Sequence, residues 1–143
     1  MTEQRLSFPP EGAALREVRA KVREMAAALG AAPEIQDRVA LVVDELVNNA
    51  IEHGASYREA GTDLSVSIRV EGDHLAIDFF DLEMPTSEVA ELAEGLRASA
   101  AGMPALESER GRGLFLLSVY LEDLAAGPAE QGGLRLSGRL QRQ

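Results

Sequence analysis

The stretch from Leu64 to Phe79 constrains the fold more than any other part of the sequence. Apolar and polar residues alternate over residues 64–70, and the alternation returns over residues 75–79. Between them, Glu71-Gly72-Asp73-His74 has the composition of a tight turn. A period of two predicts strands with one buried face, and the short turn makes the pair an antiparallel hairpin. Such a sheet needs an apolar layer to cover that face.

Segments with helical spacing supply this layer. Apolar residues recur every three or four positions over residues 13–29, 33–54 and 89–96, and residues 113–124 are apolar enough for a buried helix. Further strands are predicted at 5–8, an edge strand stopped by two prolines, and at 134–140, while 98–110 lacks periodicity and is predicted to be a loop. We therefore predict an α+β protein: a two-layer sandwich in which helices cover one face of a mixed, mostly antiparallel sheet.

Composition narrows the possible functions. The 143 residues, with 45% hydrophobic and 27% charged side chains, predict a single folded domain spanning 1–143. The net charge of −10 disfavours nucleic acid as a partner and is compatible with a basic or mixed-charge protein partner. The absence of cysteine excludes thiolate chemistry. No long apolar run or leader-like start is present, so we expect no membrane association and a cytoplasmic location.

Residues 44–54, DELVNNAIEHG, carry the first candidate for chemistry. Glu45 and Asn49 are four residues apart, so a helix places both on one side, at the flank of the apolar stripe. A carboxylate and an amide oxygen one turn apart can orient a hydroxyl nucleophile and bind Mg²⁺, as phosphoryl transfer requires. The same spacing is also common for ordinary solvated residues, and spacing alone leaves both interpretations open.

Two further features can each be interpreted as part of a functional site or as ordinary structure. Asp81 ends an apolar strand, where a carboxylate can accept the exocyclic amine of adenine or can serve as a turn residue. The run Arg110-Gly111-Arg112-Gly113-Leu114 stands before an apolar segment. Free N–H groups at a helix start bind phosphate, although an ordinary helix start would look alike.

Taken in this order, the motifs ELVNNAIEHG, Asp81 and GRGLFLL resemble the N-box, G1 box and G2 box of the family that unites gyrase, histidine kinases and MutL. Over nearly its whole length the chain is similar to the anti-sigma-factor serine kinases of the RsbW and SpoIIAB type. The resemblance implies a Bergerat-type ATP-binding fold that binds ATP and Mg²⁺.

The resemblance also assigns roles to individual residues. It implies that Glu45 is the general base, that Asn49 is a nucleotide-site residue and Mg²⁺ ligand, and that Asp81 reads adenine. It further implies that the cofactor-binding residues include Arg110, Gly111, Arg112, Gly113 and Leu114.

Two positions qualify these assignments. His53 matches the histidine that ends the N-box helix, and its place on the apolar stripe favours packing or capping of that helix end. The family's G1 box has a glycine two residues after its aspartate, where this chain has Glu83. A side chain there is expected to bring bulk and negative charge near the nucleotide.

The resemblance implies an anti-sigma regulator that binds ATP and Mg²⁺, sequesters a sigma factor, and phosphorylates a serine on a STAS-domain anti-anti-sigma factor. It also implies a homodimer. The alternative is a non-catalytic protein-binding module on the same scaffold, which Glu83 favours. A detached histidine-kinase catalytic domain is less compatible with the sequence, because neither of its histidines, His53 and His74, lies in a phosphoacceptor helix.

Overall fold

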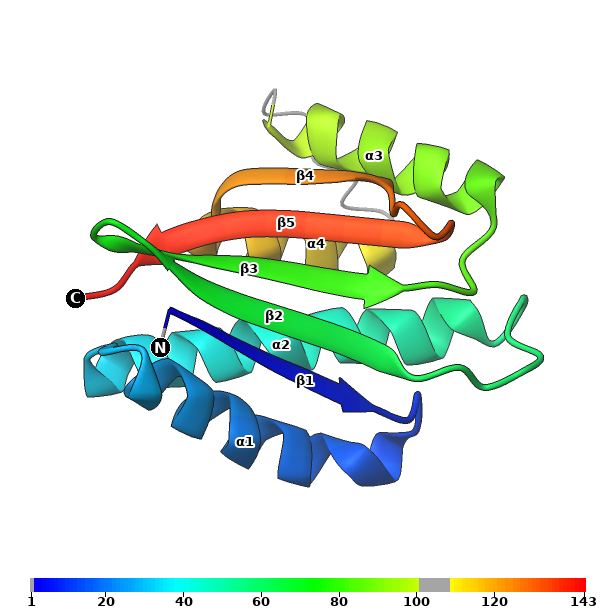
Figure 1. The fold of residues 1–143 in the computed structure, drawn as a ribbon. Helices are drawn as coiled ribbons and strands as arrows, with labels where there is room; N and C mark the ends of the chain where they lie inside the picture. Colours follow the sequence, from blue (N-terminus) through cyan, green and yellow to red (C-terminus); the bar gives the residue numbers. More distant parts are fainter. Residues whose placement is uncertain (1, 101–108) are drawn as a thin grey trace.

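In the described part of the chain, five strands form one sheet in the order β1-β2-β3-β5-β4 (Figure 1). The computed structural model describes the backbone of residues 2–100 and 109–143 and the side chains of 2–98 and 115–143. The elements are β1 (Glu3–Phe8), a 3-10 turn (Gly12–Ala14), α1 (Leu15–Ala28), α2 (Pro33–Gly54), β2 (Leu64–Glu71), β3 (His74–Asp81), α3 (Thr86–Ala100), α4 (Glu109–Tyr120), β4 (Glu122–Pro128) and β5 (Leu134–Gln141).

Every pair of neighbouring strands is antiparallel. The predicted hairpin is confirmed as β2 and β3, with Val66 opposite Phe79 and Ile68 opposite Ile77. The α+β fold with helices on one face of the sheet is therefore confirmed.

The helices form the second layer. Helices α2 and α4 lie behind the sheet in the view of Figure 1, α1 packs on α2 beside β1, and α3 lies along the edge strand β4. The apolar stripe of α2 is buried, Val39, Val43 and Val47 among it, and packs in one core with the inward side chains of β2 and β3. Helix α2 begins and ends as predicted, with Pro33 in its first turn and Gly54 as its last residue.

The predicted loop at 98–110 is wrong at both ends. Helix α3 continues to Ala100 and α4 already begins at Glu109, while residues 101–108 lie outside the described part. Alanine is the best helix former, so the small residues at the end of α3 extend a helix without adding apolar periodicity. The 13–29 prediction differs from α1 by one or two residues at each end.

The buried helix predicted for 113–124 is also wrong in its limits. Helix α4 ends at Tyr120, and β4 follows as a strand with a register shift and with Asp123 at φ 54°. The sequence of β4, EDLAAGP, has low strand propensity, so its pairing with β5 determines its conformation. Helix α4 is only partly covered, because Leu117 is buried but Phe115, Leu116 and Val119 are exposed.

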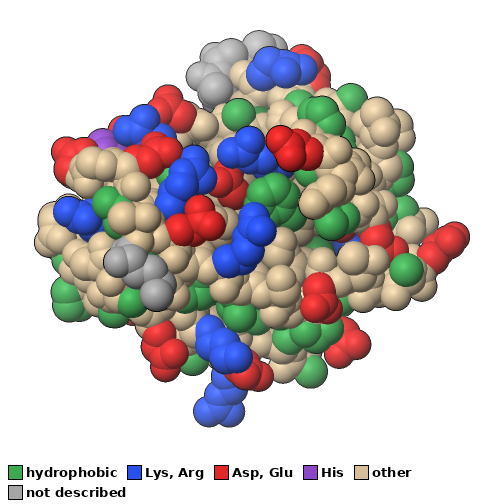
Figure 2. Space-filling model, viewed as in Figure 1, with side chains coloured by type: hydrophobic (Ala, Val, Ile, Leu, Met, Phe, Trp, Pro, Cys, Tyr) green, Lys and Arg blue, Asp and Glu red, His purple; other side chains and the backbone are tan. Residues whose placement is uncertain are grey.

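The face of the sheet that the helices leave uncovered is polar, with arginine and carboxylate side chains at its centre (Figure 2). Asp78 is buried there, and both Arg69 and Arg135 pair with its carboxylate. The Arg5 guanidinium lies 5.7 Å from the centre of the Phe80 ring. The buried charge of Asp78 is thus neutralised on the open face, away from the helix layer.

Among the described residues, no helix has both the length and the apolar character that a membrane span requires.

Candidate functional site

Helix α2 carries Glu45 and Asn49 one turn apart, and both side chains are half-buried. Asn49 lines a cavity between α2, the sheet, α3 and α4, whereas Glu45 is not among the residues that line it. The neighbouring Asn48 and Asp44 point elsewhere, since the Asn48 amide donates to Asp44 at 3.4 Å and Asp44 faces Arg19 at 3.8 Å. The geometry therefore separates the two asparagines and leaves Asn49 at the interior.

The cavity beside Asn49 is small and apolar. Its walls include Phe79 of β3, Met84 after β3, and Leu117 of α4. The volume of about 20 Å³ has room for roughly one water molecule. A purine ring does not fit this space in the described arrangement, so nucleotide binding at this place requires the surrounding elements to move apart.

Asp81, at the end of β3, is 1% exposed and is held by two residues of the loop that follows α2. Arg58 donates to both carboxylate oxygens, at 3.0 Å from Nη1 to Oδ1 and at 2.7 Å from Nη2 to Oδ2. The Tyr57 hydroxyl donates to Oδ2 at 2.7 Å, and the backbone N–H of Glu83 donates to Oδ1 at 3.2 Å. Asp81 is therefore the acceptor of a buried, bidentate ion pair.

The end of α2 positions Arg58. Its Nη2 also donates to the backbone oxygen of Ala50 at 3.1 Å, which joins the last turns of α2 to the end of β3. A Cβ at Gly54 would collide with the guanidinium, so the glycine leaves room for Arg58 to reach across the helix end. The hydrogen bond to Asp81 raises the pKa of Arg58. Burial and the Asp81 hydrogen bond raise the pKa of Tyr57, so its phenol stays protonated and donates.

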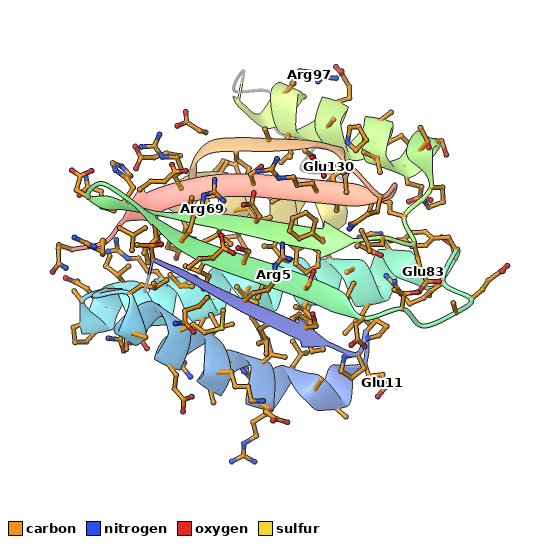
Figure 3. All side chains as sticks on the ribbon, viewed as in Figure 1. Arg5, Glu11, Arg69, Glu83, Arg97 and Glu130 are labelled. Atoms are coloured by element: carbon orange, nitrogen blue, oxygen red, sulfur yellow. The ribbon has the colours of Figure 1, made fainter. Side chains whose placement is uncertain are left out.

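Glu83 takes a different role from the one expected of it. Its carboxylate accepts the backbone N–H groups of Glu59, Ala60 and Thr62, at 3.1, 3.0 and 2.7 Å, and lies 3.4 Å from Arg58. Figure 3 shows Glu83 at the end of the sheet, beside the loop between α2 and β2. The side chain thus ties down the loop that carries Tyr57 and Arg58.

Glu83 makes the stability of this loop dependent on pH. Burial favours the neutral acid, but the three N–H donors and Arg58 outweigh it and lower the pKa of Glu83 below its ordinary value of 4.5. A carboxyl group with a lowered folded-state pKa stabilises the fold above its unfolded-state pKa, and this contribution is lost as pH falls through the folded-state value. We expect the stability difference between the wild type and Glu83→Gln to be constant near neutral pH and to shrink below about pH 4.5.

Urea unfolding at a series of pH values measures this difference. Glu91→Gln, at an exposed position on α3, is the control and is expected to show no such change. A Glu83→Gln difference that persists undiminished to about pH 3 would contradict the role of the charged carboxylate.

For most of the remaining predicted site residues, the structure describes the backbone but not the side chain. The backbone of Arg110, Gly111, Arg112, Gly113 and Leu114 belongs to α4, and their side chains lie outside the described ones. Because α4 begins at Glu109, the glycine pair lies inside its first turns and does not precede the helix. His53 is half-buried in the last turn of α2, and its Nε2 has no hydrogen-bond partner among the described residues.

Sequence reasoning did not single out Tyr57 and Arg58. They lie more than 20 residues before Asp81 and follow a helix end without a recognisable motif. Two donors directly after a glycine-ended helix are a weak signal, and only the packing of that helix on β3 brings them to the carboxylate.

The antiparallel sheet and the helix layer on one face define a two-layer α+β domain. The chain belongs to the histidine kinase-like ATPase domain family, whose model matches residues 8–136. This confirms the predicted family. No curated protein matches the chain.

Two solved structures show the same fold. One is the SiaB-SiaC complex from Pseudomonas aeruginosa, with a TM-score of 0.69 and 22% identity over 96% of this chain and 87% of that one. The other contains the RsbU and RsbW domains of Rv1364c from Mycobacterium tuberculosis, with a TM-score of 0.59 and 17% identity over 99% of this chain. This chain spans 32% of that second structure. At these identities the likeness concerns the fold.

Proposed function

We propose that the protein is a cytoplasmic regulator that binds ATP and Mg²⁺, phosphorylates a serine on a STAS-domain anti-anti-sigma factor, and sequesters a sigma factor. The observation that carries this proposal is the pair on α2, with Asn49 at the interlayer cavity and Glu45 one turn away. The family and the fold of the two solved structures support it. Homodimer formation is part of the proposal, and light scattering on the purified chain tests it.

The proposed roles follow from the chemistry of the two side chains. The carboxylate of Glu45 accepts the proton of the acceptor serine hydroxyl, and the amide oxygen of Asn49 is a ligand for Mg²⁺. Bound ATP supplies the phosphoryl group and brings the metal to the site. Arg110 and Arg112, with the backbone of Gly111, Gly113 and Leu114, contact its phosphates in this proposal.

Some residues of the candidate site suit ATP and Mg²⁺, and others do not. The carboxylate and amide of α2 suit a hydroxyl and a hard cation. The small cavity and the fully engaged carboxylate of Asp81 do not accommodate the base in the described arrangement. This second observation favours the other candidate function, a protein-binding module that sequesters its partner without catalysis.

Calorimetry with ATP, with and without Mg²⁺, tests the proposal and separates the two candidates. We expect binding that depends on Mg²⁺, and we expect Asn49→Ala to weaken it by about 10- to 100-fold, because an oxygen ligand of the metal ion is lost. Asn48→Ala is the matched control, since that amide contacts Asp44 and should not affect binding. No binding by the wild type would favour the non-catalytic module, and equal effects of both variants would contradict the role of Asn49.

A further inference from the structure

The carboxylate of Asp81 has no acceptor position left. An ionised carboxylate offers about four lone-pair sites. Oδ1 receives Arg58 Nη1 and the Glu83 N–H, and Oδ2 receives Arg58 Nη2 and the Tyr57 hydroxyl. The exocyclic amine of an adenine would be a fifth donor, so it can hydrogen-bond to Asp81 only if one of the present donors leaves.

The two side-chain donors come from a loop outside the sheet. Tyr57 and Arg58 lie in the irregular segment between α2 and β2, whereas Asp81 belongs to a central strand paired on both sides. Displacing that segment breaks no strand pairing, so it costs less than displacing Asp81. Besides the bonds to Asp81, Glu83 ties this segment to the sheet end, because its carboxylate accepts three backbone N–H groups of residues 59–62 and approaches Arg58.

The same segment also joins the walls of the interlayer cavity. Arg58 bonds both to Asp81 and to the backbone oxygen of Ala50, and Ala50 lines the cavity beside Asn49. Met84, another lining residue, donates its N–H to the backbone oxygen of Asp81 at 3.3 Å. Arg58 thus connects the α2 wall to the β3 wall at the place where the cavity would have to widen.

We propose that Arg58 and Tyr57 occupy the Asp81 carboxylate, the acceptor for the adenine amine, and so compete with the nucleotide for it. In this way they set both the affinity and the base specificity of nucleotide binding. This inference rests on the proposed function, because it takes Asp81 as the acceptor of the adenine amine. In the structure described above, the Arg58 guanidinium and the Tyr57 phenol already donate to the Asp81 carboxylate. Nucleotide binds when the segment carrying them moves away, and Glu83 resists this movement.

The experiment compares two variants that keep a side chain of similar length at each position, Tyr57→Phe and Arg58→Lys. The first removes one donor to Oδ2, and the second replaces a bidentate fork by a single ammonium. Each leaves a lone pair free for the amine, so we expect ATP to bind about tenfold more tightly than to the wild type. Titration calorimetry measures the affinity on the full chain, with urea unfolding in parallel to verify the fold.

Two controls make the result specific. Inosine triphosphate lacks the exocyclic amine, so in either variant its affinity should rise less than that of ATP. Arg69→Lys changes another arginine–aspartate pair, with the buried Asp78 on the open face of the sheet, and it should leave ATP affinity unchanged.

A gain in both variants that is larger for ATP than for inosine triphosphate supports the proposal. Wild-type binding of ATP with no gain in either variant overturns it and leaves the proposed function standing. Equal gains for ATP and inosine triphosphate also overturn it, because the effect would then not act through the amine. Absence of ATP binding in the wild type and in both variants overturns this proposal and the ATP-dependent function together.

Discussion

Glu45→Gln is expected to lower the rate of phosphoryl transfer to the proposed STAS-domain partner by about 10²- to 10⁴-fold, which is the usual contribution of a general base. The amide keeps the size of the side chain but cannot accept the serine proton at neutral pH. Glu45 is half-buried on the flank of α2 and is not part of the hydrophobic core, so the fold should change little. A time course of serine phosphorylation with purified proteins measures the rate.

Asp44→Asn is the matched control for this experiment. Asp44 precedes Glu45 on the same helix, but its carboxylate faces Arg19 and Asn48, so its loss should leave the rate nearly unchanged. Partner binding, measured in a pull-down with the purified STAS-domain protein, should persist in both variants. A loss of binding that parallels the loss of rate in Glu45→Gln would contradict the role of a base.

Arg58→Ala is expected to destabilise the protein by about 3–5 kcal/mol, because it leaves the carboxylate of Asp81 buried without its counter-charge. Arg58 is 11% exposed and Asp81 is 1% exposed, so solvent replaces little of the lost interaction. The truncation also removes the hydrogen bond to Ala50 and the contact with Glu83. Thermal unfolding should show a fall in Tm of roughly 10 °C or more for a domain of this size.

A double-mutant cycle with Asp81→Asn shows whether the loss belongs to this pair. Removing the charge of Asp81 takes away the reason for the penalty, so the double variant should lose less stability than the sum of the two single variants. A coupling of about 0.5–3 kcal/mol is typical for residues in direct contact. Additive losses would mean that Arg58 stabilises the protein mainly through its packing over Gly54.

The candidate site was predictable only where its chemistry lies on one element. Glu45 and Asn49 share α2, so their spacing alone places them on one flank, and the family match at residues 8–136 agrees with the motifs from which they were selected. The roles of both residues stay predictions. The engagement of Asp81 by Tyr57 and Arg58 joins a loop to a strand end, and no local pattern encodes such a contact.

Glu83 is a second residue whose contacts could not be predicted from the sequence. As a departure from the G1 glycine, it predicts obstruction of the nucleotide. Its carboxylate instead accepts the N–H groups of a loop more than 20 residues earlier in the chain. Close backbone approach beside Asp81 is provided by Gly133, at φ 80°, where a Cβ would collide with the backbone of Asp81 and Leu82.

Local patterns in the sequence are sufficient to predict the β2–β3 hairpin, the limits of α2, the closing strand β5 and the one-sided helix layer. These features follow from periodicity and from residues such as Pro33 and Gly54, which act within a few positions of themselves. Three features became visible only in the folded chain: residues 122–128 form a strand, α4 begins before its glycine pair, and Arg58 closes over Asp81. Strand pairing with β5 and the desolvation of a buried carboxylate act between segments distant in sequence, so their energies appear only when the chain is folded.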